Sequence, residues 1–376
     1  MSAVIGILNK HSIALASDSA VTISGGGSRK ILNTANKIFT LSKYHPVGVM
    51  IYNSAEFMGT PWEIIIKMYR KQLGEKSFNK VDDYRRDFVK YLRAQNFFSD
   101  QKDQEKALYD YCFLSLNILN REAIHEHKEL LKKLDKKNKE KILALIESKA
   151  DEYIKIFEKE KPCEDFKEFK ISSFSSFVKE PFEYAVEKLF NELGFEPSEK
   201  LKKKLQKFLF LHLKAKNFIE FQPFSGLVFV GYGDKQIYPH LVPMNISFAL
   251  EDKLRACIDD KRAAHISNEM HAVIRPFAQT DVIDTILSGI DPALENVYHQ
   301  NFSTFLAKYN ELIARLAEGE SEELAGNIRS LDIKKLTQNY IEEVNDIQQT
   351  TYINKMLQSV SSLPKEDLAE MAESLI

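Results

Sequence analysis

The stretch that decides the fold is residues 2–18, which read Ser-Ala-Val-Ile-Gly-Ile-Leu-Asn-Lys-His-Ser-Ile-Ala-Leu-Ala-Ser-Asp. Two short apolar runs, 3–8 and 13–16, flank the polar Asn-Lys-His-Ser. Runs of this length around a polar break predict a β-hairpin. A hairpin places the start of its first strand beside the end of its second, so we expect Asp18 to lie beside Ser2.

Ser2 carries a second signal, because it directly follows the initiator Met1. A small residue in this position favours removal of the initiator methionine, and Ser2 would then hold both a hydroxyl and a free α-amine. A nucleophile with its own base attached is a known arrangement for amide hydrolysis. Ser2 is therefore a candidate catalytic nucleophile.

Strand and helix patterns then follow one another along the chain. Apolar runs predict a strand at 36–41, which has Lys37 near its start, and another at 47–52. Helical spacing begins after Pro61, a residue suited to the first turn of a helix. We expect helices at 81–92, 106–119, 121–159, 182–193 and 200–214, strands at 226–233, 237–242, 246–250 and 272–274, and helices from 282 to the end.

The first sixty residues resemble the opening of a known enzyme family. Ser2, residues 15–19, residues 36–39 and the strand around Gly48 are similar to the proteasome-type N-terminal nucleophile (Ntn) hydrolases. The chain looks like a bacterial proteasome-like member with a large helical insertion, and a weaker likeness returns after residue 224. The resemblance implies an α+β fold, the αββα sandwich of that family, formed by residues 1–60 and 221–376, with 61–220 as a helical insertion.

The resemblance also implies a site and a class of substrate. The substrate would be a peptide or another amide, and the ring assembly of the family suggests a homo-oligomer. We expect neither a metal nor a cofactor. The implied residues are Ser2, Asp18 and Lys37 as catalytic groups, the backbone of Tyr52 or Asn53 as oxyanion hole, and Gln279, Thr280 and Asp281 as the turn beside the nucleophile.

The chain departs from the family pattern at several positions. The nucleophile is Ser2, where the proteasome has threonine, although related Ntn hydrolases use serine. Ala20 replaces an arginine, and Tyr52 or Asn53 stands where the family has the glycine of the oxyanion hole. The sequence ends on a helical run where the family fold continues into strands, so either the last strands are missing or the fold is modified.

Composition limits the other classes of function. The 376 residues are 44% hydrophobic and 28% charged, which is ordinary for a globular protein, and a net charge of −2 favours neither nucleic acid nor an anionic membrane. No apolar run approaches the roughly 20 residues of a membrane helix. Cys112, Cys163 and Cys257 are far apart and odd in number, which predicts a reducing compartment without structural disulfides and hence a cytoplasmic protein.

Three other motifs favour simpler interpretations. The run Gly-Gly-Gly-Ser-Arg-Lys at 25–30 lacks the spacing of a phosphate-binding P-loop, so a loop between strands, near the site, is expected. His125 and His127 are two residues apart and would not share a helix face, which argues against a metal site. The lysine runs at 132–137 and 202–204 alternate with acids, as on a solvated helix face.

A second class of function stays open, because fold does not imply activity. Proteasome α-type subunits share the Ntn fold and carry no nucleophile. The alternative to a hydrolase is therefore a non-catalytic scaffold that binds partners through its helical insertion. The two differ in one requirement, since catalysis needs a free Ser2 amine within hydrogen-bond reach of Lys37.

Overall fold

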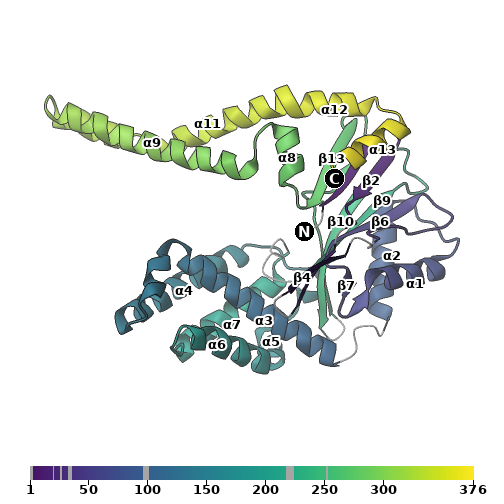
Figure 1. Ribbon diagram of the computed structural model, residues 1–376, viewed down its shortest axis with the longest axis horizontal. Helices are drawn as coiled ribbons and strands as arrows, with labels where there is room; N and C mark the ends of the chain where they lie inside the picture. Colours follow the sequence, from purple (N-terminus) through teal and green to yellow (C-terminus); the bar gives the residue numbers. More distant parts are fainter. Residues whose placement is uncertain are drawn as a thin grey trace. The chain divides into compact units, whose positions relative to one another are not determined.

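The computed structural model describes residues 3–19, 21–25, 28–32, 36–95, 101–216, 224–250 and 253–376. These residues form an α+β structure in which all the strand pairs are antiparallel. The chain divides into two compact units, one made of residues 1–33 and 266–376 and the other of 34–265. Figure 1 shows the elements of both units, coloured along the chain.

The first unit is built on a three-stranded sheet. Its central strand β1 (Ala3–Asn9) lies between β2 (Ile13–Ser17) and β13 (Ala272–Ala278). β1 and β2 pair with Val4 opposite Ser17, so the hairpin predicted from the opening sequence is confirmed. β13 comes from the far end of the chain and gives β1 a partner on both sides.

Helices of the first unit cover one face of this sheet. Ile5 and Ile7 of β1 are fully buried against a cluster that includes Val360 and Leu368, which lie on the last two helices. The helical elements of this unit are α8 (Asp281–Ser288), α9 (Pro292–Glu318), α10 (Glu322–Arg329), α11 (Ile333–Ile347), the π-helical η4 (Gln348–Ile353), α12 (Asn354–Ser361) and α13 (Lys365–Ser374).

Asn9 ties the hairpin to the end of α12. Its buried side chain donates from Nδ2 to the carbonyls of Val360 and Leu363, each at 2.9 Å. Its Oδ1 accepts from the backbone N–H groups of His11 and Ser12, also at 2.9 Å. These four bonds use the full capacity of the amide, so the polar group is buried without an unmet donor or acceptor.

The second unit contains the larger sheet, in the order β11-β10-β9-β6-β5, with β12 paired to β10. Helices α1 (Trp62–Leu73) and α2 (Val81–Ala94) pack on it, and the ring centroids of Phe88 and Phe229 are 5.5 Å apart. The strands of this unit are β5 (Ile38–Thr40), β6 (Val47–Asn53), β7 (Glu56–Phe57), β8 (Thr60–Pro61), β9 (Ser225–Gly231), β10 (His240–Leu250), β11 (Lys253–Ile258) and β12 (Ala264–His265).

A helical cluster with its own core completes the second unit. Two lysines of the run at 202–204 on its last helix are paired: Lys204 contacts Glu147 at 2.8 Å and Asp151 at 2.7 Å, and Lys202 contacts Glu183 at 3.0 Å. The elements of the cluster are α3 (Gln101–Ile124), η2 (His125–Lys132), α4 (Lys136–Phe157), η3 (Glu164–Phe166), α5 (Ile171–Phe177), α6 (Lys179–Glu192) and α7 (Glu199–Lys214).

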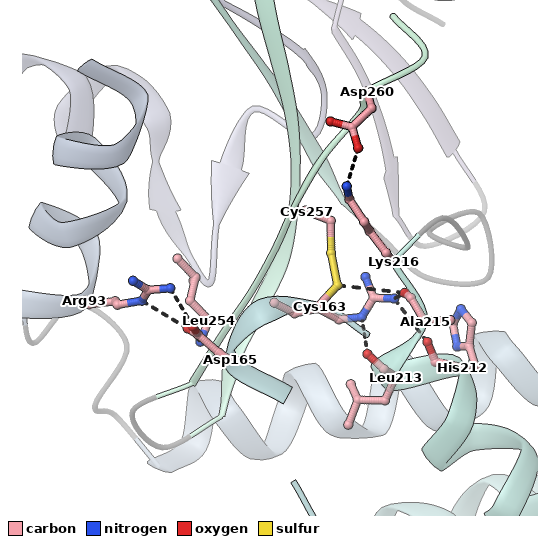
Figure 2. Close-up of a disulfide and its surroundings, with 11 residues drawn as sticks. Arg93, Cys163, Asp165, His212, Leu213, Ala215, Lys216, Leu254, Cys257 and Asp260 are labelled. Atoms are coloured by element: carbon pink, nitrogen blue, oxygen red, sulfur yellow. Dashed lines mark hydrogen bonds and ion pairs between the residues drawn. A yellow bond between two sulfur atoms is a disulfide. The ribbon is translucent and has the colours of Figure 1, made fainter. Parts of the chain in front are cut away.

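One sequence expectation is wrong, because Cys163 and Cys257 form a disulfide (Figure 2). The two residues are 94 positions apart in sequence, but their Cα atoms are 5.9 Å apart in the fold. Spacing along the chain does not reveal such a pair. Cys112 stays a buried thiol. The cysteine content therefore gives no argument for a reducing compartment.

Three predicted elements have different limits in the structure. The helix expected over 121–159 is divided by η2, which contains a non-helical residue, His127. The strands expected at 237–242 and 246–250 belong to one strand, β10, which begins at His240. The glycine loop at 25–30 is largely a second hairpin, β3 (Val21–Gly25) with β4 (Ser28–Leu32).

Candidate functional site

The start of β1 is held directly against the end of β2. The backbone N–H of Ala3 donates to Oδ1 of Asp18 at 3.0 Å, and the N–H of Asp18 donates to the carbonyl of Ala3 at 3.0 Å. Asp18 is therefore beside Ala3, the first described residue, whereas the sequence predicted it beside Ser2. Ser2 itself lies outside the described residues, and it is joined to Ala3 by a peptide bond.

The predicted active-site turn reaches the same end of β1 from the other side. Ala278, the last residue of β13, lies opposite Ala3. Gln279 follows, Thr280 is the N-cap of α8, and Asp281 is the first residue of that helix. The first unit thus places Ala3 between Asp18 and the strand that leads into residues 279–281.

The second unit brings together the other predicted residues. Lys37 is buried and stands just before β5, where its carbonyl accepts a hydrogen bond from the N–H of Ile51 at 2.8 Å. Lys37 is therefore opposite Ile51 of the neighbouring strand β6. Tyr52 and Asn53 directly follow Ile51 on that strand. Within this unit, the proposed lysine and the proposed oxyanion position therefore lie near one another, just before β5 and at the end of the neighbouring strand β6.

Tyr52 occupies the space that a glycine would leave open. Its ring covers Gly226, where an added Cβ would lie 1.9 Å from Tyr52 Cζ, and its hydroxyl donates to Asn245 Oδ1 at 2.9 Å. Burial raises the pKa of the Tyr52 phenol to about 12, so the hydroxyl stays protonated at neutral pH. The Tyr52 side chain is thus a structural group whose hydroxyl is already engaged with Asn245.

Residues with a strained backbone lie in the predicted oxyanion segment, at Asn53, and directly before the predicted 279–281 turn, at Ala278. Among the described residues, Asn53, Met58 and Ala278 are the non-glycine residues with positive φ. Asn53 and Ala278 both have φ of 64°, a conformation that costs side-chain-bearing residues energy and that clusters at functional sites. Asparagine is a recognised signal for such a conformation. Alanine is not, so Ala278 could not have been singled out from the sequence.

The predicted residues therefore fall into two groups. Asp18 and the 279–281 turn belong to the first unit, and Lys37 with Tyr52 and Asn53 belongs to the second.

In the described ranges, no three His, Cys, Asp or Glu side chains converge as ligands of a metal ion. The same ranges contain no helix whose length and apolar character would let it cross a bilayer.

Comparison of the chain with protein-family models, with curated proteins and with solved structures gave no match. Function has to be inferred from the residues and from the geometry described above.

Proposed function

We propose that the protein is an Ntn-type hydrolase that cleaves an amide or peptide bond, with Ser2 as its N-terminal nucleophile. One observation carries the proposal: the first described residue, Ala3, is flanked by Asp18 on one strand and by Ala278 and the 279–281 turn on the other. The αββα sandwich of the Ntn family and its three catalytic residues are part of the same proposal.

The proposed chemistry uses the α-amine of Ser2 as general base. An α-amine has an ordinary pKa of about 7.7–8.0, and a cation such as Lys37 nearby would lower that pKa and increase the neutral fraction. The neutral amine accepts the proton of Ser2 Oγ while Oγ attacks the substrate carbonyl. The protonated amine then gives its proton to the leaving amine, and water releases the acyl group from Ser2. Asp18 and Lys37 complete the proposed catalytic set, as the resemblance to the Ntn family implies.

The tetrahedral intermediate needs a donor for its oxyanion. We assign this role to a backbone N–H at Asn53, because the Tyr52 side chain is already engaged with Gly226 and Asn245. Removal of one such donor costs roughly 2.7–4 kcal/mol of transition-state stabilisation in other hydrolases. The positive φ of Asn53 supports the assignment, since it sets this peptide apart from the regular strand before it.

The direct test is hydrolysis of a panel of peptide amides by the wild type and by Ser2→Ala. We expect Ser2→Ala to lose turnover and to keep its folded structure. Ser173→Ala is a matched control, because Ser173 is exposed on α5, far from β1 in sequence. Equal turnover in Ser2→Ala and in the wild type would overturn the proposal, and inactivity of the wild type on every substrate would favour a scaffold.

Self-association is the second part of the proposal. Along α9, all of which is described, Ala314 alone is buried. From Phe305 to Leu316 the exposed apolar residues recur at the alternating four- and three-residue spacing of helices that pack on another helix. We infer that the partner is the same helix of a second copy, and that Phe305→Glu would lower the mass measured by sedimentation, whereas Asn301→Glu would not. The exposed large apolar residues of α9 are Leu294, Val297, Tyr298, Phe305, Tyr309, Leu312 and Leu316.

A further inference from the structure

A cavity of about 570 Å³ lies within the second unit, beside the disulfide. Its walls come from α2, from the segment around η3 and from β11, and both Cys163 and Cys257 line it. The volume is in the range of small-molecule sites, which is about 300–1,000 Å³. This cavity contains none of the residues assigned to the proposed hydrolase, so it is a separate candidate site.

The lining is strongly cationic. α2 contributes Arg85, Arg86, Lys90 and Arg93, which follow one face of the helix. The opposite wall contributes three more cations, and Glu164 is the one carboxylate among the described lining residues. A concentration of one sign of charge in a recess raises the local concentration of the opposite ion. The cations of the opposite wall are Lys161, Lys167 and Lys216.

The carboxylates that pair with these cations stand mostly outside the lining. Asp82 is shared, because it contacts Arg85 Nε at 2.6 Å and Arg86 Nη2 at 2.8 Å. Asp165 pairs with Arg93 and Asp260 with Lys216, as Figure 2 shows. These three acids restrain cations of the lining and are not themselves part of it.

Two of the lining lysines have no carboxylate partner at all within the described part of the chain. Lys90 and Lys161 are both exposed, and both line the cavity from opposite walls. Ordinary surface lysines on this protein are often paired, as Lys202 and Lys204 are. The unpaired ammonium groups on either side of one recess are suited to an anion that bridges them.

The wall that carries Lys161 and Lys216 is rigid before any ligand arrives. Pro162 forms a strand-type bridge with Ala215, and the N–H of Lys216 donates to the carbonyl of Lys161 at 2.9 Å. The disulfide fixes the same wall to β11, and the buried Arg255 donates from Nη2 to the Ala215 carbonyl at 2.8 Å. A preformed site loses little conformational freedom on binding, which favours affinity.

We propose that this cavity binds a small molecule that carries several phosphate groups. Guanidinium groups match phosphate oxygens in a two-point geometry, and lysines add compact positive charge. Val89, Pro162 and Ile258 give the recess an apolar patch beside the cations. A nucleoside polyphosphate, which joins a ring to a phosphate chain, fits that combination of surfaces.

Isothermal titration calorimetry of the full chain with ATP, without divalent cations and without reductant, tests the proposal. We expect saturable binding with one site per chain, and we expect Lys90→Gln/Lys161→Gln to weaken it at least tenfold. Inorganic tripolyphosphate is the second probe, and we expect it to bind less tightly than ATP because it cannot use the apolar patch. Both substituted lysines are exposed, so the variant should fold normally, which its melting curve verifies.

The matched control is Lys136→Gln/Lys137→Gln, which removes the same charge from exposed positions at the start of α4. Affinity for ATP should be unchanged in this control. Absence of saturable binding of both probes would overturn the proposal. An equal loss of affinity in the two double variants would also overturn it, because binding would then follow net charge and not this cavity.

Discussion

Ala3 and Asp18 are joined by two reciprocal hydrogen bonds: the N–H of Ala3 donates to Oδ1 of Asp18, and the N–H of Asp18 donates to the carbonyl of Ala3, each at 3.0 Å. The first bond uses the side chain of Asp18 and the second uses its backbone. The pair fixes where the chain enters β1. Whatever precedes Ala3 must start from this point, beside the carboxylate.

Asp18→Asn separates the structural role of this residue from its charge. Asparagine keeps an oxygen that can accept a hydrogen bond from the N–H of Ala3. The free energy of unfolding of the variant should therefore lie within about 1 kcal/mol of the wild-type value. Loss of the charge should slow acylation of Ser2 by about 10²-fold, the lower end for a positioned catalytic group. Urea unfolding and the rate of Ser2 acylation measure the two effects. An unchanged acylation rate would remove Asp18 from the proposed mechanism.

Gly226→Ala should destabilise the protein because the Tyr52 ring leaves no room for a methyl group. The new Cβ would lie 1.9 Å from Tyr52 Cζ, and forced overpacking of this kind typically costs about 1–3 kcal/mol. Gly326→Ala on α10 is the control, since no atom lies within 4 Å of its added Cβ. Alanine there should raise stability by roughly 0.5–1 kcal/mol. Similar melting temperatures for the two variants would contradict the packing described here.

The Cys163–Cys257 disulfide should contribute to stability through the 94-residue separation that it spans. Cross-links of this kind typically stabilise by about 2–4 kcal/mol. The double variant Cys163→Ser/Cys257→Ser should lose that amount in chemical unfolding. Dithiothreitol should lower the stability of the wild type to the level of the variant and leave the variant unaffected. A wild type that is indifferent to dithiothreitol would show that the pair is not cross-linked in solution.

His240 should make the stability of the protein depend on pH in the mildly acidic range. Burial is the main cause that lowers the pKa of His240, and the neighbouring His265 and Lys80 lower it further. In the unfolded chain His240 has an ordinary pKa of about 6.5. Below that pH the imidazole of His240 therefore binds a proton more readily in the unfolded chain than in the folded one. The contribution of His240 is fully present above about pH 6.5 and is lost as the pH falls toward its folded pKa.

The variant His240→Gln should lose less stability between pH 7.5 and pH 5.5 than the wild type does. Urea midpoints at the two pH values measure this difference. An equal loss in both proteins would mean that His240 does not supply the pH dependence.

Local sequence patterns were sufficient for much of the first unit. The alternation of apolar runs and a polar break before Asp18 encodes the β1–β2 hairpin, and Asp291-Pro292 encodes the start of α9, where the Asp291 side chain accepts from the N–H of Leu294. Both signals are contained within a few residues. Such signals are readable because neighbours in sequence supply the deciding interactions.

Features that depend on distant partners were not readable. The disulfide joins residues that only the folded chain brings together, and a turn at 279–281 near the start of β1 was implied by the family resemblance and not by any local pattern. The cationic cavity is a similar case, because its two walls come from α2 and from a segment about 70 residues later. The arginines and lysines of α2 show a helical period, but nothing in that period indicates what lies opposite them.

The central claim is that Ser2 is a reactive N-terminal nucleophile. The most direct test is the intact mass of the purified protein before and after treatment with an acylating electrophile, followed by peptide mapping of the modified site. If Ser2 is the nucleophile, we expect loss of Met1 and a single acyl group on Ser2. Retention of Met1, or a free Ser2 that stays unmodified while the protein is folded, would contradict it.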